Sequence, residues 1–243
     1  MRRFWCEKEN ISGGKVYFTK EEAAHIKKVL RMQAGDKMIV SSGDGVDLLC
    51  RLLDSPDCVA EIEETKINEN EPGCELALFQ GIIKNEKMDY AVQKAAEIGV
   101  TRIVPVICGR TVVKTENAKD RKNKQERWQR IAREACKQCG RSKVPQVDEP
   151  VEFQKAAEIF SHFETKLVAF EEEKTKSISS AVAKSGSVAY FIGPEGGMES
   201  EEHACLVNNG GVSVSLGKRI LRAETAAVVC GAVILAFLGE MDI

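Results

Sequence analysis

Short apolar runs alternate with amphipathic stretches of helical length from residue 74 onward, and this alternation restricts the possible folds more than any other feature. Strands that are apolar on both faces are typical of a parallel sheet covered by helices on both sides, so the pattern predicts an α/β domain. The expected strands are 76–83, 103–107, 167–170, 188–192 and 212–216. The expected helices are 87–98, 125–139, 153–162, 177–184, 199–208 and a last one from Glu224.

The first seventy residues show a different sequence pattern, in which short β-like runs alternate with turns. One helix is expected after Thr19, which can cap it together with Glu22 three residues later. The polar segment 68–73 ends in Pro-Gly, which is typical of a linker. The sequence therefore predicts a small, mostly β domain over 1–72 and the α/β domain over 73–243.

Composition argues against a strongly basic chain, a secreted protein held by disulfides and a membrane-spanning protein. The 243 residues carry a formal net charge of -2, so any nucleic-acid surface must be a local patch. Nine cysteines and an N-terminus without an apolar leader favour reduced thiols in the cytoplasm. The longest apolar run, Ala226–Leu238, is too short to span a bilayer and is expected to be a buried helix.

One segment is strongly basic. Residues 110–143 carry twelve Lys or Arg against four Asp or Glu, a local charge of +8 on a near-neutral chain. A cluster of this kind favours a polyanionic partner over a simple solvated face. It lies beside an amphipathic helix pattern whose apolar side includes Trp128 and Ile131.

Motifs for nucleophilic or metal chemistry are weak. His25, His162 and His203 are scattered and accompany no nucleophile, so a Ser/His/Asp site is not supported. Cys136 and Cys139 have metal-like spacing but no second pair, so they are interpreted as thiols and no metal site is predicted.

Two loops near the C-terminus are better candidates for a site. Residues 193–197 read Gly-Pro-Glu-Gly-Gly between a buried strand and a helix, a tight turn where backbone can approach a ligand closely. The second loop follows the strand ending at Leu216 and carries Arg222 just before a helix. Loops at the carboxyl ends of parallel strands are where open α/β sheets bind ligands, so the two could flank one crevice.

With these loops, nearly the whole chain resembles the RsmE family of 16S ribosomal RNA uracil-N3 methyltransferases, which belong to the SPOUT class. The most specific match is Gly-Pro-Glu-Gly-Gly paired with Leu-Gly-x-x-Ile-Leu-Arg-x-Glu-Thr-Ala; Ala223 stands where the family also often has threonine. The other matching segments are 3–5, 25–32, 35–36, 84, 87–89, 93–100, 127–135 and 138–141.

The resemblance implies a trefoil-knotted SPOUT methyltransferase domain, an exception to the unknotted rule, with an N-terminal PUA-like RNA-binding β-barrel. It also implies a cytoplasmic homodimer that acts on 16S rRNA within the small ribosomal subunit, without membrane or DNA partners. Its cofactor would be S-adenosyl-L-methionine, bound between the knot loops, with Arg222 as the catalytic residue. The cofactor-binding residues would be Phe170, Gly193, Pro194, Glu195, Gly196, Leu216, Gly217, Ile220, Leu221 and Thr225. The RNA-binding residues would be Arg2, Arg3, Arg31, Lys84, Arg133 and Arg141.

Methylation of uracil N3 requires the nucleophile to be held near the methyl carbon and the N3 proton to be removed. Arg222 could stabilise charge on the neighbouring carbonyl oxygens. The proton acceptor stays open: Glu195 and Glu224 are in reach by sequence, although turn-holding and helix-capping roles are favoured for them. Two other interpretations of the sequence stay open. One is an enzyme that methylates another RNA atom, such as a ribose 2′-hydroxyl, and the other is a catalytically silent RNA-binding factor.

Overall fold

The computed structural model describes residues 1–113, 117–182 and 186–241, and the chain forms two compact units. Unit 1 comprises Met1–Glu71 together with Cys136–Val144, and unit 2 comprises Pro72–Ala135 and Pro145–Ile243. The division expected at residue 72 did not anticipate that 136–144 group with unit 1. Lys114 and Glu116 of the basic segment, and residues 183–184 of the helix expected at 177–184, lie outside the described residues.

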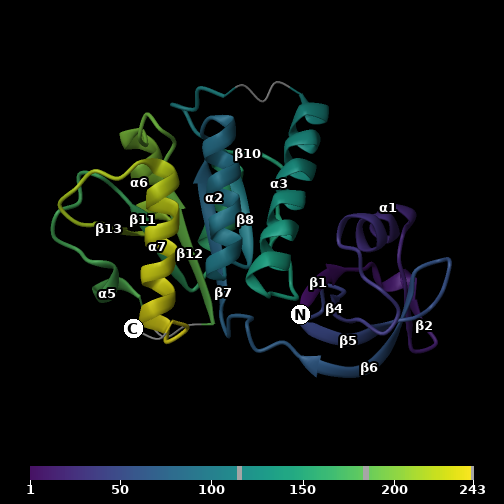
Figure 1. The fold of residues 1–243 in the computed structure, drawn as a ribbon. Helices are drawn as coiled ribbons and strands as arrows, with labels where there is room; N and C mark the ends of the chain where they lie inside the picture. The colour runs from purple at the N-terminus through teal and green to yellow at the C-terminus, as the bar shows by residue number, and fades with distance from the viewer. Residues whose placement is uncertain (114–116, 183–185, 242–243) are drawn as a thin grey trace. The chain divides into compact units, whose positions relative to one another are not determined.

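Unit 1 contains a six-stranded sheet in the order β1-β4-β5-β6-β3-β2 (Figure 1). The pair β1–β4 is parallel and the remaining pairs are antiparallel. Its strands are β1 (Arg2–Trp5), β2 (Ile11–Ser12), β3 (Lys15–Tyr17), β4 (Lys37–Ser41), β5 (Val46–Leu52) and β6 (Val59–Ile67). A 3-10 turn, η1 (Lys8–Asn10), connects β1 to β2.

The helix of unit 1 begins where its cap was predicted. The Thr19 hydroxyl accepts a hydrogen bond from the Glu22 amide, and the Glu22 carboxylate accepts one from the Thr19 amide. This capping box satisfies donors that the first helical turn leaves open. The helix α1 (Lys20–Ala24) continues into a π-helical turn, η2 (His25–Val29), which places Ile26 in the unit 1 core.

Arg3 was expected to bind RNA, and the structure corrects this. Its side chain is 11% exposed, and its guanidinium hydrogen-bonds both carboxylate oxygens of Asp47 on β5, the strand beyond β4 in the sheet. Burial acts to raise the pKa of Asp47, but hydrogen bonds from Arg3, Asn68 and Ser41 and the Arg3 charge outweigh it, so the pKa is lowered. Held in this way, the Arg3 side chain stabilises the sheet, and its guanidinium is not available to contact a phosphate.

Arg141 is corrected in the same way. Its side chain is 3% exposed, and its Nη2 lies 3.1 Å from Glu71 Oε2. The other oxygen of Glu71 accepts hydrogen bonds from the backbone amides of Ser142 and Lys143, each at 2.7 Å. Glu71 therefore holds the segment 136–144 within unit 1, and Arg141 is a structural residue.

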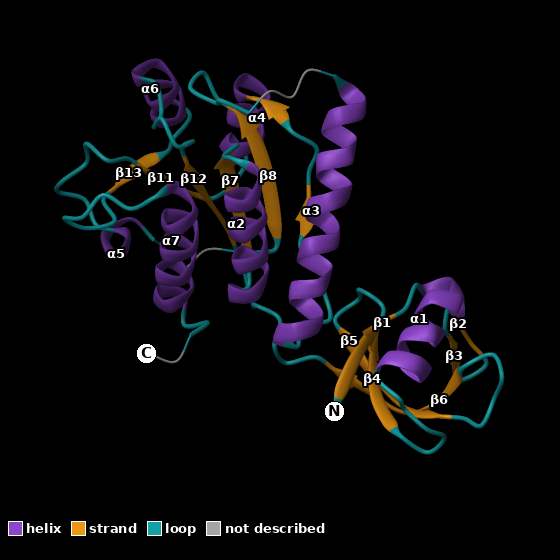
Figure 2. Ribbon diagram, turned by 45° about the horizontal axis from the view of Figure 1, so that its top comes forward, coloured by secondary structure: helices purple, strands orange, loops and turns teal. Residues whose placement is uncertain are grey.

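Unit 2 contains a parallel sheet, as the apolar runs predicted, in the order β10-β8-β7-β12-β11-β13 with β9 beside β8 (Figure 2). Its strands are β7 (Glu75–Gly81), β8 (Arg102–Ile107), β9 (Gln146–Val147), β10 (Val151–Glu152), β11 (Thr165–Ala169), β12 (Ser187–Ile192) and β13 (Val212–Val214). Its helices are α2 (Asn85–Ile98), α3 (Ala118–Cys139, whose last turn belongs to unit 1), α4 (Phe153–Ser161), α5 (Ile178–Ala181), α6 (Ser200–Asn208) and α7 (Ala223–Leu238).

Helices cover both faces of this sheet. The helices α2 and α7 pack together, and α7 contacts β7 and β12; α4 and α6 pack together and contact β8 and β11 respectively. Phe79 and Phe191 belong to the core beneath α4 and α6, while the buried Tyr190 donates a hydrogen bond to the Ala227 carbonyl in α7. Adjacent residues of one strand thus face opposite helix layers, which is why these strands are apolar throughout.

The C-terminal helix approaches the sheet closely. A side chain at Gly231 would place its Cβ 2.6 Å from the Tyr190 hydroxyl oxygen, so only glycine fits between α7 and β12. The apolar run expected to be a buried helix is therefore buried on one face only, and Phe237 on this run is exposed. No helix within the described residues is long and apolar enough to cross a membrane.

The helix α3 begins seven residues earlier than the apolar spacing indicated. Residues 118–124 are mostly charged and show no apolar periodicity, but Asn117 Oδ1 accepts a hydrogen bond from the Asp120 amide and caps the helix start. The capped, charged first turns extend α3 through most of the basic segment.

The Glu71–Arg141 pair yields a testable prediction. Glu71→Gln should lower the free energy of unfolding of unit 1 by about 3–5 kcal/mol, because it leaves a buried guanidinium without its carboxylate. Urea denaturation followed by tryptophan fluorescence measures this, in a Trp128→Phe background so that the buried Trp5 reports on unit 1. The exposed neighbour Glu69→Gln is the control and should change it by less than about 0.5 kcal/mol. Equal effects of the two substitutions would contradict the structural role of the pair.

Candidate active site

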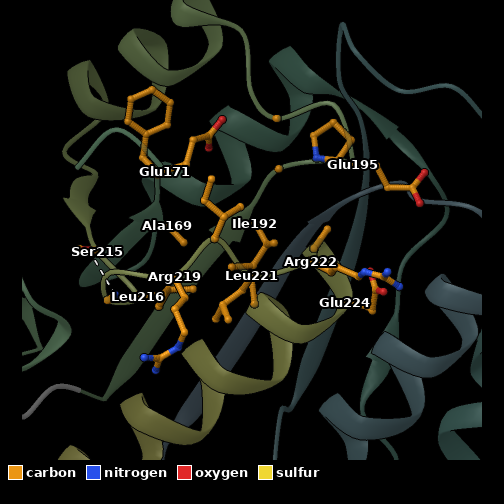
Figure 3. Close-up of a pocket in the computed structure, with 18 of the residues that line it drawn as sticks. Ala169, Glu171, Ile192, Glu195, Ser215, Leu216, Arg219, Leu221, Arg222 and Glu224 are labelled. Atoms are coloured by element: carbon orange, nitrogen blue, oxygen red, sulfur yellow. Dashed lines mark hydrogen bonds between the residues drawn. The ribbon is translucent and has the colours of Figure 1, made fainter. Parts of the chain in front are cut away.

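A cavity of about 700 Å³ opens in unit 2 at the carboxyl ends of β11, β12 and β13 (Figure 3). Three loops and the first turn of α7 surround it, and Lys87 from α2 adds to its edge. Its volume is in the range of small-molecule sites, and its place is where open parallel sheets bind ligands. Its lining is made of Lys87, residues 169–171, Lys174, 192–197, 215–224 and Ala226.

The first wall is the turn at 193–197. It is closed by a hydrogen bond from the Gly197 amide to the Pro194 carbonyl, and Gly197 has φ +76°, which favours glycine. The turn lies directly against β7, because a Cβ on Gly81 would be 2.5 Å from the Pro194 nitrogen. Only glycine at position 81 permits this approach.

Two side chains from other elements hold this turn. The Lys87 ammonium on α2 forms an ion pair with Glu195, and the Arg110 guanidinium donates a hydrogen bond of 3.1 Å to the Gly196 carbonyl. The sequence interpretation of Glu195 as a turn-holding residue agrees with this ion pair. The turn is therefore contacted from two sides in the absence of a ligand.

The second wall follows β13. The Ser215 amide donates a hydrogen bond of 2.8 Å to the Lys176 carbonyl, and the Ser215 hydroxyl accepts one from the Gly217 amide. The loop then crosses the cavity edge to Arg222, which occupies the N-cap position of α7. Ile220 on this loop is 90% exposed, so its side chain covers little of the cavity in this state.

The third loop follows β11. Phe170 lines the cavity, and its ring stacks on the His203 ring of α6 with centroids 3.8 Å apart and an interplanar angle of 13°. The loop beyond it is folded around Glu173, whose carboxylate accepts hydrogen bonds from Thr175 and from the Lys176 amide. The Thr175 hydroxyl and the backbone amides lower the pKa of Glu173 to about 2.

Charged and apolar groups separate within the cavity. Ala169, Ile192 and Leu221 lie in the middle of the view, while Arg222 and Glu224 lie toward one end, on the same side as Glu195 (Figure 3). The Arg222 side chain makes no hydrogen bond or ion pair with any residue that the structure describes, and it is exposed. The cavity thus has an apolar middle, with Arg222, Glu224 and Glu195 on one side of it and Glu171 on the other in this view.

The structure brings together most of the residues predicted from the sequence. Arg222 lines the cavity with nine of the ten predicted cofactor-binding residues. Those nine are Phe170, Gly193, Pro194, Glu195, Gly196, Leu216, Gly217, Ile220 and Leu221. Thr225 is exposed on the first turn of α7 and is not among the lining residues.

The remaining predicted RNA-binding residues lie in both units. Arg2 and Arg31 are exposed in unit 1, where Arg2 Nη1 donates to the Leu30 carbonyl. Lys84 is exposed directly before α2, and Arg133 is half-buried on α3, both in unit 2. These four stay candidates for phosphate contacts, unlike Arg3 and Arg141.

Sequence reasoning missed several lining residues. Glu171 and Lys174 follow the predicted strand that ends at Phe170, so the rule for carboxyl ends of strands could have identified them. Arg219 and Lys218 lie inside the second loop and could have been found in the same way. Arg110 carried no local signal, because its partner Gly196 is 86 residues away.

Comparison with known proteins places the chain in a family. Residues 69–235 match the model of an RNA methyltransferase domain, and residues 18–63 match that of an RNA methyltransferase PUA domain. The ribosomal RNA small subunit methyltransferase E of Bacillus subtilis (strain 168) is 35% identical over 240 residues, covering 93% of each chain. The protein of the same name from Synechocystis is 32% identical and covers 95% of this chain and 76% of its own length.

Comparison with solved structures gives the same result as the comparison of sequences. The ribosomal RNA small subunit methyltransferase E of Neisseria gonorrhoeae, crystallised with S-adenosyl methionine, superposes with a TM-score of 0.88 at 31% identity over 97% of both chains. A Legionella pneumophila protein in complex with the same cofactor superposes with a TM-score of 0.87 at 30% identity over 96% of both chains. The chain belongs to the ribosomal RNA small subunit methyltransferase E family, with an RNA methyltransferase domain and a PUA domain.

Proposed function

We propose that this protein transfers the methyl group of S-adenosylmethionine to N3 of a specific uridine in 16S rRNA of the small ribosomal subunit. One observation carries the proposal: the turn at 193–197 and the Arg222 loop form two walls of one cavity at the carboxyl edge of the sheet. The family supplies the class of reaction, an rRNA methyl transfer that uses S-adenosylmethionine. The choice of uracil N3 rests on the whole-chain resemblance to the RsmE family.

The cavity fits the chemistry of this cofactor. Adenine presents donors and acceptors that backbone amides and carbonyls of the three loops can match, and Leu216 and Leu221 can cover its faces. The Glu171 carboxylate, which lies against Gly197, can accept hydrogen bonds from ribose hydroxyls or the cofactor's ammonium. The charged end near Arg222 then remains for the reacting groups.

Bound S-adenosylmethionine supplies an electrophilic methyl carbon, and the protein supplies position and charge. The fixed turn and the apolar middle would hold the cofactor so that the uracil N3 meets the methyl carbon in line. As N3 loses its proton, negative charge spreads to the uracil carbonyl oxygens, and the guanidinium of Arg222 can donate hydrogen bonds to them. A base within folded RNA must leave its stack to reach this position.

In this proposal the two domains have different functions. The PUA domain over 1–72 would bind RNA as a β-barrel, and the domain over 73–243 would be the SPOUT catalytic domain with a trefoil knot around the cofactor loops. The family-model matches at 18–63 and 69–235 support this division of roles. Action on small subunits also implies a cytoplasmic location.

The reaction is tested with small ribosomal subunits from a strain that lacks this protein. We expect purified protein and S-adenosylmethionine to produce 3-methyluridine in 16S rRNA, detected by mass spectrometry of digested RNA. Arg222→Ala should lower the single-turnover rate at least about 10²-fold, the cost of removing a donor to developing charge. Arg219→Ala on the same loop is the matched comparison and should lower it less.

Other products would contradict the proposal. A ribose-methylated nucleotide in place of 3-methyluridine would indicate transfer to a 2′-hydroxyl. The absence of any methylation, together with no binding of S-adenosylhomocysteine at millimolar concentration in calorimetry, would indicate an RNA-binding factor without catalysis.

The basic segment yields a second prediction for RNA binding. Lys122 and Arg130 are exposed on α3, so charge reversal at both should weaken binding to small subunits and lower the slope of log affinity against log salt by about 2. Fluorescence anisotropy with labelled 16S rRNA measures both quantities. Lys155→Glu on α4 is the control, because Lys155 is also exposed but lies outside the basic segment. An unchanged affinity and slope would exclude α3 from the RNA-binding surface.

We also propose that the protein is a homodimer, as the resemblance implies. The helix α7 supports this with half-buried apolar side chains and with Phe237, which is 52% exposed. Light scattering coupled to size exclusion should give a mass of two chains, and Phe237→Glu should shift it toward one chain. A one-chain mass for the unmodified protein at micromolar concentration would contradict a stable dimer.

A further inference from the structure

Glu224 is a carboxylate without an assigned partner in the cavity. It lies on the first turn of α7, lines the cavity, and is two residues from Arg222. Its Oε2 is buried, yet it has no hydrogen-bond partner among the described residues. A buried carboxylate oxygen that lacks a donor is costly, so such a group is retained where a ligand can supply the donor.

The structure does not support the helix-capping role expected for Glu224. The residue at the N-cap position of α7 is Arg222, and its backbone carbonyl accepts the Ala226 amide. No hydrogen bond joins the Glu224 carboxylate to a backbone amide of the described helix. Its charge can still interact with the helix dipole, but that interaction leaves the buried oxygen unsatisfied.

The other two carboxylates of the cavity are engaged or placed elsewhere. Glu195 forms the ion pair with Lys87 that holds the glycine turn. Glu171 extends from the loop after β11 and lies on the far side of Ile192 from Arg222 in the view of Figure 3. Glu224 is therefore the cavity carboxylate best placed to act together with Arg222.

The pair matches the edge of uracil. That edge presents an N3–H donor between two carbonyl oxygens, so it requires an acceptor beside a donor. The Glu224 carboxylate only accepts hydrogen bonds and the Arg222 guanidinium only donates them. Cytosine carries no hydrogen on N3 and would present an acceptor to the carboxylate, so the same pair would disfavour it.

We propose that Glu224 is the proton acceptor for uracil N3, an inference that rests on the proposed function. The Glu224 oxygen takes the N3 proton, and the electron pair of the N3–H bond is left on the nitrogen. That pair forms the new N3–CH3 bond as the bond between methyl and sulfur breaks, which yields 3-methyluridine and S-adenosylhomocysteine. The neutral carboxylic acid then loses its proton to solvent. Arg222 stabilises the carbonyl oxygens throughout.

The test uses Glu224→Gln in the intact protein with small subunits as substrate. Single-turnover methylation should fall by about 10²–10³-fold, within the range for loss of a general base. Calorimetry should give unchanged affinity for S-adenosylhomocysteine, because the residue acts on uracil. Glu201→Gln is the matched control: Glu201 occupies the same second position of α6, is exposed, and lies outside the cavity. This control should leave the rate unchanged.

The pH dependence distinguishes a proton acceptor from a structural residue. Raising the pH ionises N3 without the enzyme's help, so the deficit of Glu224→Gln should shrink as pH rises. Transcribed RNA with 5-fluorouridine, whose N3–H is more acidic, should reduce the deficit further at neutral pH. Glu224→Asp keeps a carboxylate and should retain the wild-type pH profile at a lower rate. If a thermal unfolding assay shows that Glu224→Gln folds poorly, the Glu224→Asp variant tests the proposal in its place.

Three outcomes would overturn the inference. One is a deficit that stays constant with pH and with 5-fluorouridine, and another is a tenfold loss of S-adenosylhomocysteine affinity, which would assign Glu224 to the cofactor. The third is a wild-type rate in Glu224→Gln. Failure of the proposed function is a separate result, because it would appear as wild-type protein that forms no 3-methyluridine.

Discussion

The turn at 193–197 touches the end of β7 so closely that residue 81 must be glycine, and the site is organised around this contact. Because β7 and β12 are parallel neighbours, the contact fixes the turn above the sheet's carboxyl edge. Lys87 and Arg110 then hold the turn from α2 and from the loop after β8. The resulting wall is already formed without a ligand, which lowers the entropy cost of positioning a cofactor against it.

Two groups of charged residues in this chain have different roles. Arg3, Arg141 and Lys87 each have a carboxylate partner and stabilise the fold within their own unit. Arg222 and Glu224 have no such partner among the described residues and meet at one end of a cavity. A folded protein rarely retains a buried carboxylate oxygen without a donor, such as the Glu224 Oε2, unless a ligand supplies that donor. The absence of partners therefore points to chemistry at this end of the cavity.

The sequence predicted the parallel sheet and the two loops because both depend on local patterns: apolar runs for strands, and glycine or arginine at strand ends. It could not predict that Arg141 would be buried by Glu71, seventy residues away, since a pair of this kind is set by tertiary packing. For the same reason the grouping of 136–144 with unit 1 was missed, and two structural arginines were assigned to RNA. Of the predicted cofactor residues, Thr225 failed to line the cavity because the first turn of α7 directs it to solvent.

The central claim is that the loops after β12 and β13 form a single S-adenosylmethionine pocket. A crystal structure of the protein with S-adenosylhomocysteine tests it most directly. We expect the adenine between the turn at 193–197 and the loop at 216–222, with the sulfur directed toward Arg222 and Glu224. Ligand density at any other place on the protein, with this cavity empty, would contradict the claim.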